Sequence, residues 1–148
     1  MTYQFKKSSY IKANAQIDGE MCERLAADDN LSAKALLDAN RPEDAPLHNA
    51  FEWDDSVAAE SWRVHQARHI INSLEVVIDG KEPVRAYFNI VRTEPEYRHI
   101  DTILQRQDTT QALLLTAYRE LLAFRKKYSK LEQLAQVFAA VDQLNIAE

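Results

Sequence analysis

Residues 75–90 read EVVIDGKEPVRAYFNI, and this stretch separates the helical parts of a 148-residue chain. Its first apolar run, 75–78, and its second run, 84–90, show the period-two alternation of β-strands. Asp79-Gly80 follows the first run, and an Asp-Gly pair is a strong turn signal for a β-hairpin. The sequence therefore predicts a hairpin here. A weaker alternation over 99–104, after Pro95, predicts a third strand and a small antiparallel meander.

Three helices are predicted before the hairpin, whereas residues 1–14 show no clear period. The first covers 16–27, and the second covers 33–39 with Ser32 as its N-cap. Pro42 and Pro46 make 41–50 a loop. The third and longest helix runs from Asp55 to about Leu74, with Asp54 and Asp55 as cap and first turn. Its predicted apolar face consists of Ala58, Trp62, Ile70, Ile71 and Leu74.

The part of the chain after the hairpin is also predicted to be helical, because 96–148 contains neither glycine nor proline. Asp108 with Gln111 resembles a capping box at the start of a helix. Apolar residues then recur at alternating spacings of three and four, which predicts one long helix with a seam for a homodimer. The alternative is a helical hairpin broken near Ser129, which forms a second capping box with Glu132. The dimer-seam candidates are Leu114, Leu121, Phe124, Tyr128, Leu131 and Phe138.

These elements predict a mostly helical α+β fold in two parts, 1–106 and 107–148. The chain has two glycines, so no glycine-rich phosphate-binding loop can be written, which excludes Rossmann and P-loop nucleotide enzymes. Its single cysteine excludes an internal disulfide. No export signal is recognisable, and no apolar run approaches the roughly 20 residues that cross a bilayer. The sequence therefore predicts a cytoplasmic protein without membrane contact.

The order of two helices, a longer helix and a hairpin is that of a winged helix-turn-helix, with 55–74 as the nominal recognition helix. Its charge opposes DNA binding, because residues 10–78 contain six basic and thirteen acidic side chains. Affinity for DNA depends strongly on phosphate neutralisation. The candidate nucleic-acid contacts are Arg63, Arg68, Arg85, Arg92, Arg125, Lys126, Lys127 and Lys130.

No residue pattern points to catalysis, and we predict neither a metal nor another cofactor. His65 and His69 lie four residues apart but lack the glutamate of an HExxH zinc site. Helix capping explains the carboxylates at 52–55 more simply than a metal does. We instead take Glu52, Trp53, Asp54 and Asp55 as candidates for binding a partner protein. Arg63 is expected to pair with Glu60 and to hold the 41–53 loop on the long helix.

A signature around the third helix resembles one found in small bacteriophage and prophage proteins of unassigned activity. It consists of Pro46-Leu47-His48, Phe51-Glu52-Trp53-Asp54-Asp55, Ala58-Ala59, Arg63 and Gln66-Ala67-Arg68. The resemblance implies a phage or prophage origin, a location in the bacterial host's cytoplasm and an accessory role. It implies no catalytic residue.

The expected function is therefore that of a non-enzymatic phage accessory protein that binds a macromolecule. A winged-helix-like regulator or another nucleic-acid-binding protein is the leading interpretation. The alternative is that this chain binds or inhibits a host protein, with its own acidic N-terminal half mimicking nucleic acid.

Overall fold

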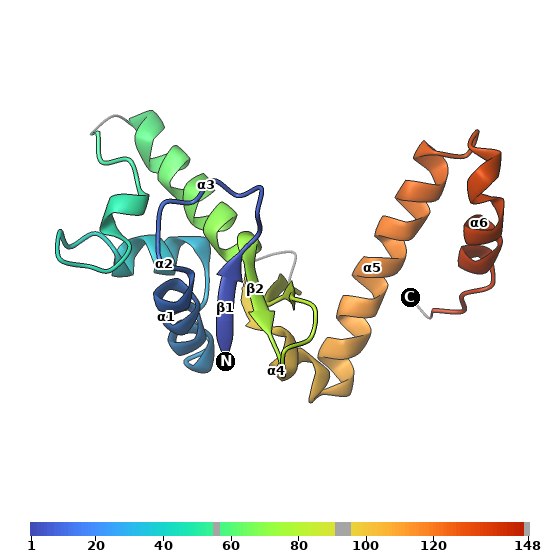
Figure 1. Ribbon diagram of the computed structural model, residues 1–148, viewed down its shortest axis with the longest axis horizontal. Coiled ribbons are helices and arrows are strands. Elements are labelled where there is room, and N and C mark those ends of the chain that lie inside the picture. The colour runs from blue at the N-terminus through green and yellow to red at the C-terminus, as the bar shows by residue number, and fades with distance from the viewer. Residues whose placement is uncertain (55–56, 91–95, 147–148) are drawn as a thin grey trace. The chain divides into compact units, whose positions relative to one another are not determined.

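The computed structural model describes residues 1–54, 57–90 and 96–146. The chain divides into two compact units, 1–102 and 103–148, which we describe separately (Figure 1). The described residues form a mostly helical α+β fold with a small antiparallel sheet, as the sequence predicts. None of the helices in these residues is long and apolar enough to cross a membrane.

Three helices of the first unit lie close to their predicted positions. They are α1 (Ala15–Ala27), α2 (Ala33–Ala39) and α3 (Val57–Ser73). Ser32 caps α2 as predicted, because its hydroxyl accepts a hydrogen bond from the Ala35 amide at 3.0 Å. The predicted loop before α3 contains a short 3-10 helix, η1 (His48–Ala50). The predicted cap of α3 at Asp55 lies outside the described residues.

The hairpin that follows α3 belongs to a three-stranded antiparallel sheet of order β1-β2-β3. Its strands are β1 (Thr2–Phe5), β2 (Leu74–Val77) and β3 (Val84–Arg85). Asp79 and Gly80 have φ angles of 50° and 68°, as the predicted turn requires. The sequence gives no signal for β1. Its outer edge is covered by Gln16, whose side chain accepts a hydrogen bond from the Tyr3 amide and donates one to the Met1 carbonyl.

The predicted second strand of the hairpin is interrupted at Ala86. The Ala86 amide donates to the Leu74 carbonyl, and the Ala86 carbonyl accepts from the Ile100 amide. Beyond this point β4 (Tyr87–Asn89) pairs with β5 (Tyr97–His99) in a second sheet. The prediction of a strand over 99–104 is therefore wrong. Only His99 of that range lies in a strand, and the chain turns at once into helix α4 (Ile100–Leu104), which buries Ile103.

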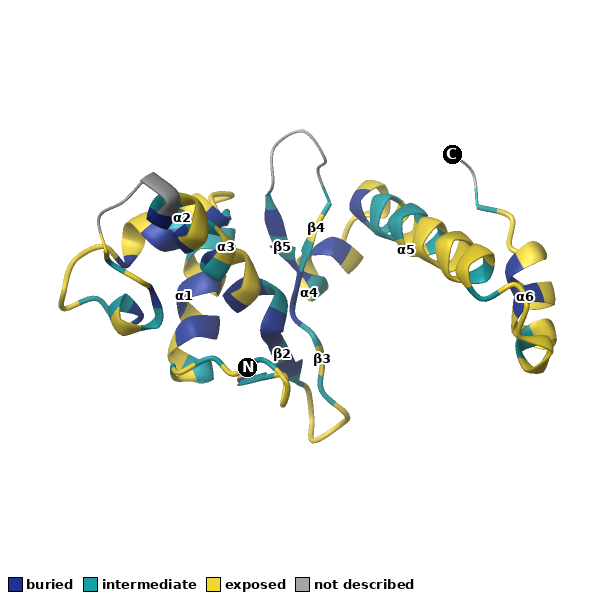
Figure 2. Ribbon diagram, turned by 90° about the horizontal axis from the view of Figure 1, so that it is seen from above, coloured by how far each residue is buried: buried dark blue, intermediate teal, exposed yellow. Residues whose placement is uncertain are grey.

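The core of the first unit lies between α1, α2, α3 and the strands (Figure 2). Leu36, Ile71 and Val76 are all fully buried, and burial of one such aliphatic side chain stabilises the fold by roughly 1.5–3 kcal/mol. Gly19 is required for this packing, because a Cβ atom there would lie 2.1 Å from the Tyr3 ring.

The second unit is a helical hairpin, so the prediction of one long helix is wrong and the alternative of a break near Ser129 is correct. The predicted capping box of Ser129 with Glu132 is wrong, because Leu131 is the N-cap of the 3-10 helix that begins at Glu132 and makes no side-chain cap hydrogen bond. Helix α5 (Gln107–Lys127) ends before Tyr128, and η2 (Glu132–Leu134) leads into α6 (Ala135–Asp142). The break brings Phe138 onto Phe124, with ring centroids 6.4 Å apart, and Arg125 onto Asp142 at 2.8 Å. One continuous helix would lose both contacts.

The predicted capping box at Asp108 is also wrong. Arg106 is the N-cap of α5, and Asp108 lies in the first turn. The hydroxyl groups of Thr109 and Thr110 both donate to the Ile103 carbonyl, and they join α4 to the start of α5.

Asp18 on α1 is a buried carboxylate, and neither of its oxygens has a hydrogen-bond partner among the described residues. Burial raises its pKa from 3.8 to about 7, because a carboxylate loses its hydration in the core. The folded state therefore binds this proton more tightly than the unfolded chain does.

We predict that the contribution of Asp18 to stability falls as the pH rises from about 4 to about 7, because Asp18 must then ionise inside the protein. Its contribution is fully present below the unfolded pKa and is lost as the pH passes the folded one. Asp18→Asn should remove this dependence and be more stable than the wild type at pH 8 by roughly 1–4 kcal/mol. Urea unfolding of both proteins across this range is the measurement. Parallel pH profiles would contradict the prediction.

Candidate functional site

The outward face of α3 is the most distinctive surface of the first unit. Its exposed residues are Ser61, Trp62, His65, Arg68 and His69, at the three- and four-residue spacings of one helical face. Within the described part of α3, no carboxylate is fully exposed on this face. The nearest one, Glu60, is half-buried and bonds to Arg41 at 2.6 Å, and this hydrogen bond holds its pKa below the usual range.

Trp62 belongs to this exposed face and not to the buried one, so its predicted place in the apolar stripe is wrong. Its side chain is 53% exposed, whereas Ile70 and Ile71 are buried. Trp62 comes eight residues before Ile70, which places it about 80° around the helix from that residue. From this offset, the sequence could have predicted that Trp62 lies at the edge of the apolar face.

Arg63, on the opposite side of α3, anchors the loop that precedes the helix. Its Nε donates to the Glu52 carbonyl, and its guanidinium also donates to the Asp54 carbonyl at 3.0 Å. It lies 5.0 Å from the Trp53 ring centroid and 3.6 Å from the Glu60 carboxylate. This is the loop-pinning arrangement that the sequence predicts. Because Arg63 is only 5% exposed, it is not available as a nucleic-acid contact, and that candidate role is corrected.

We predict that Arg63→Ala lowers the free energy of unfolding by roughly 2–3 kcal/mol, because two carbonyl groups of the loop lose their charged donor. The emission of Trp53, which packs on both His48 and Arg63, should change as well. Arg68→Ala is the matched control, since Arg68 is exposed on the same helix. Its effect should stay within about 0.5 kcal/mol. Equal effects of the two substitutions in urea unfolding would argue against the anchoring role.

A groove of about 420 Å³ runs along one side of the outward face, and we call it the aromatic groove. Trp62 stacks on His65 with ring centroids 5.4 Å apart, and His69 Nε2 donates to the Ser9 carbonyl at 2.8 Å. Tyr10 is 93% exposed and has a left-handed φ of 53°. The groove is lined by Ser9, Tyr10, Ile11, Lys12, Asn49, Ala50, Trp62, His65, Gln66, His69 and Ile70.

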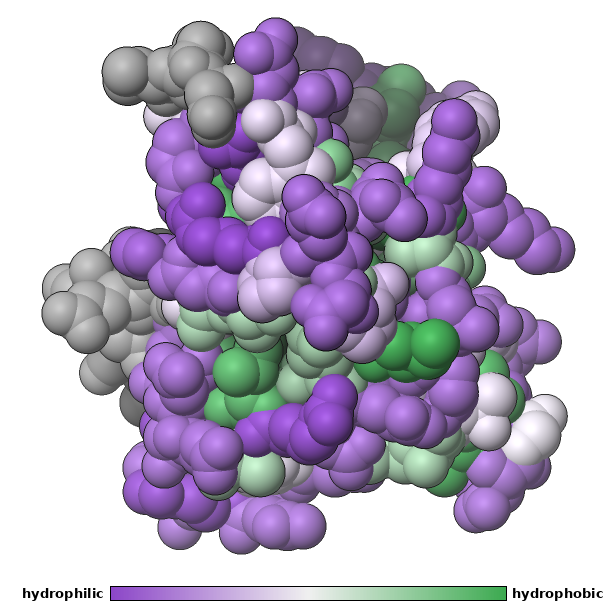
Figure 3. Space-filling view, turned by 90° about the vertical axis from the view of Figure 1, so that its left-hand side faces the viewer, coloured by the Kyte–Doolittle hydropathy of each residue, from purple (hydrophilic) through white to green (hydrophobic). Residues whose placement is uncertain are grey.

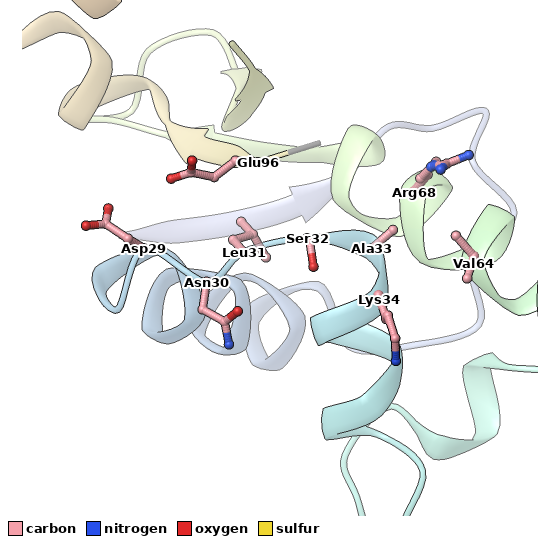
Figure 4. Close-up of a pocket in the computed structure, with 9 residues that line it drawn as sticks. All are labelled: Asp29, Asn30, Leu31, Ser32, Ala33, Lys34, Val64, Arg68 and Glu96. Atoms are coloured by element: carbon pink, nitrogen blue, oxygen red, sulfur yellow. The ribbon is translucent and has the colours of Figure 1, made fainter. Parts of the chain in front are cut away.

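A second hollow of about 400 Å³ lies on the other side of α3, and we call it the mixed-charge pocket (Figure 4). Figure 4 shows Arg68 projecting from α3 and Lys34 from α2, with Asp29 and Glu96 toward the other end. Lys34 pairs with Asp38 at 2.7 Å. Because cations and carboxylates both line this pocket, its charge favours no one sign of ligand.

The other candidate cations come from parts of the chain other than α3. Arg85 donates to the Asn72 side chain at 2.6 Å and to the Tyr87 carbonyl at 2.9 Å. Arg92 lies outside the described residues. Arg125, Lys126, Lys127 and Lys130 belong to the second unit, at the end of α5 and in the turn after it.

The four candidates for a partner-binding cluster have different environments. Glu52 and Asp54 are exposed, and one Glu52 carboxylate oxygen accepts from the amides of Trp53 and Asp54. Trp53 is half-buried against His48, to whose carbonyl its indole N–H donates at 2.7 Å. Asp55 lies outside the described residues.

The histidines do not converge on one point. His48 stacks on Trp53, and His65 stacks on Trp62. His99 is buried edge-on against Tyr87, and this burial lowers its pKa. Among the residues that the structure describes, no group of three or more His, Cys, Asp or Glu side chains could hold a metal ion.

The face seen in Figure 3 is mostly hydrophilic, with hydrophobic side chains in smaller patches between the polar ones. The sequence gives no signal for the aromatic groove, because Tyr10 and Lys12 come from a segment without periodicity and meet α3 only in the folded chain.

Comparison with known proteins gives no relative: no family model, no curated protein and no solved structure matches the chain. The resemblance to phage and prophage proteins therefore stays a prediction from the residues quoted above.

Proposed function

We propose that this chain is a non-enzymatic nucleic-acid-binding protein, an accessory protein of a phage or prophage that acts in the bacterial host's cytoplasm. The observation that carries the proposal is the outward face of α3. Residues 1–102 contain twelve basic and eighteen acidic side chains, yet the described residues that line the aromatic groove include no carboxylate. Lys12 lines this groove, and the exposed Arg68 lies on the same helix, where it lines the mixed-charge pocket.

Local charge matters more than net charge for such a surface. At physiological ionic strength, exposed charges more than about 8 Å apart are largely screened from each other. A phosphate at the groove would therefore interact mainly with Lys12, the cation of the described lining. Trp62 and Tyr10 add exposed aromatic rings, which bind bases by stacking.

The element order supports a winged-helix-like form of this proposal in part. Helix α3 precedes the β2–β3 hairpin, which is the place of a recognition helix before its wing. The wing itself is short, because β2 and β3 pair through two residue pairs. Its Arg85 is held by Asn72 and the Tyr87 carbonyl, so the hairpin offers little charge to a duplex.

A second candidate function, the binding of a basic partner protein, is favoured by the loop before α3. Its exposed carboxylates are Glu43, Asp44, Glu52 and Asp54. Arg41 and Arg63 fasten this loop to α3, so the carboxylates stand on a supported segment and not on a free one. Such an acidic surface would suit a protein that mimics nucleic acid.

We predict that the chain binds oligonucleotides with an affinity that falls as salt rises, because bound cations displace counterions from phosphates. Arg68→Ala should weaken binding and reduce the slope of log K against log salt by about 1. Arg24→Ala, which removes an exposed arginine on α1, is the matched control and should change neither quantity. Fluorescence anisotropy over a salt series measures both.

Absence of binding to single-stranded and duplex DNA and to RNA at low salt would exclude the proposed function. Titration with an arginine-rich peptide of defined sequence then tests the second candidate. Binding of this peptide that is lost in Glu43→Lys/Asp44→Lys would favour that candidate, and no binding would exclude it.

The homodimer expected from the apolar seam is also a proposal. Leu114, Leu121, Phe124 and Leu131 stay exposed in the second unit, although Phe138 is buried against the hairpin. A small helical hairpin buries little apolar surface by itself, and a second copy could cover the same residues.

We predict that light scattering gives a mass of twice the 17.0 kDa of one chain. A protein concentration of roughly tens of micromolar is sufficient for a dimer whose dissociation constant is about micromolar. Leu121→Glu should give the monomer mass, because it places a charge in the seam. Gln111→Glu, an exposed change on the same helix, serves as the control. A wild-type mass of one chain at this concentration would refute the dimer.

A further inference from the structure

We infer that the aromatic groove binds the unstacked bases of a single-stranded nucleic acid, and that the chain prefers single strands to duplexes. This inference rests on the proposed function and names its ligand. It also assigns the stacking rings, Trp62 and Tyr10, which the expected cation contacts do not include.

The two rings of the groove are exposed and are held in place by neighbouring residues. Tyr10 and Trp62 are 93% and 53% exposed, so both rings present surface to solvent that a base could cover. Trp62 is held by its stack on His65, and the segment that carries Tyr10 is fastened to α3 by the bond from His69 to the Ser9 carbonyl. The groove therefore presents aromatic surfaces on a supported frame and needs little ordering before a base can stack.

The size and the lining of the groove suit a nucleic-acid base. Its volume of about 420 Å³ lies within the range of pockets that take small aromatic molecules. Asn49 and Gln66 add side-chain amides, which can donate to and accept from the edges of a base. The Gln66 carbonyl oxygen already accepts from the Glu52 amide, so its NH₂ group is the part that a base would meet.

The charge of the groove is complementary to an anionic nucleic-acid backbone. Lys12 lines the groove, is exposed and has no ion pair among the described residues. The described lining holds Lys12 and no carboxylate, so its own side chains favour an anionic backbone. The mixed-charge pocket lacks this property, because Asp29 and Glu96 line it together with Arg68.

The aromatic rings of the groove favour single strands over duplexes. Bases inside a duplex have both faces stacked on other bases, so a protein ring reaches them only when they are unpaired. The short hairpin with its engaged Arg85 also provides no second arm for a duplex. Stacking rings and one lysine beside a groove are instead the parts that single-strand binders combine.

The test is fluorescence anisotropy of the full chain with labelled strands of about ten thymidylates or uridylates and with a duplex of the same length. We expect both single strands to bind at least about ten-fold more tightly than the duplex. Trp62→Ala and Tyr10→Ala should each weaken single-strand binding about ten-fold or more, as loss of one stacked base does. Trp62→Phe should keep most of the affinity, because it keeps a ring.

Two matched controls separate the groove from general surface effects. Ile78→Ala removes an exposed apolar side chain at the end of β2 and should leave binding unchanged. Lys12→Ala should weaken binding a few-fold, whereas Lys81→Ala, in the turn after β2, should not. Urea unfolding of every variant confirms that it is folded, and all of these positions are exposed.

The outcomes distinguish this inference from the proposed function. Equal affinity for duplex and single strand, or unchanged affinity in both Trp62→Ala and Tyr10→Ala, overturns the groove as a base-stacking site but leaves nucleic-acid binding intact. No binding to any nucleic acid overturns both. Quenching of Trp62 emission by the single strand that disappears in Trp62→Phe supports stacking at this residue.

Discussion

The buried guanidinium of Arg63 is the contact on which the outer surface of the first unit depends. It joins the backbone at 52 and 54 to α3 and packs against Trp53, whose indole reaches back to His48. Arg41 fastens the start of the same loop to Glu60. The loop supplies Asn49 and Ala50 to the aromatic groove, so a contact on the inner side of α3 positions a wall of the site on its outer side.

The parts of the fold that local chemistry determines could be predicted from the sequence. Ser32 caps α2 because its hydroxyl reaches an amide three residues away, and Asp79-Gly80 turns because two adjacent residues adopt positive φ. Long-range contacts decided the parts that the sequence did not show. Strand β1 exists because Thr2–Phe5 pairs with residues some seventy positions later, and Ala86 interrupts a strand because Leu74 and Ile100 bond to it.

The same distinction holds for the functional residues. Arg63 was interpretable because its partners lie within eleven residues along the chain, at helical or loop spacing. The aromatic groove was not, because Tyr10 and Trp62 have no pattern in common and meet through the fold. In the second unit, the three- and four-residue spacing was real, but Phe124 and Phe138 satisfy it by packing across a turn and not along one helix.

The Gln16 side chain has a consequence for how this protein can meet others. An exposed sheet edge offers unpaired amides and carbonyls, and foreign strands add to it in β-augmentation and in aggregation. Gln16 occupies the Tyr3 amide and the Met1 carbonyl on the outer side of β1. A side chain of α1 thus blocks strand pairing at this edge of the sheet. A foreign strand would have to displace Gln16 before it could pair with β1.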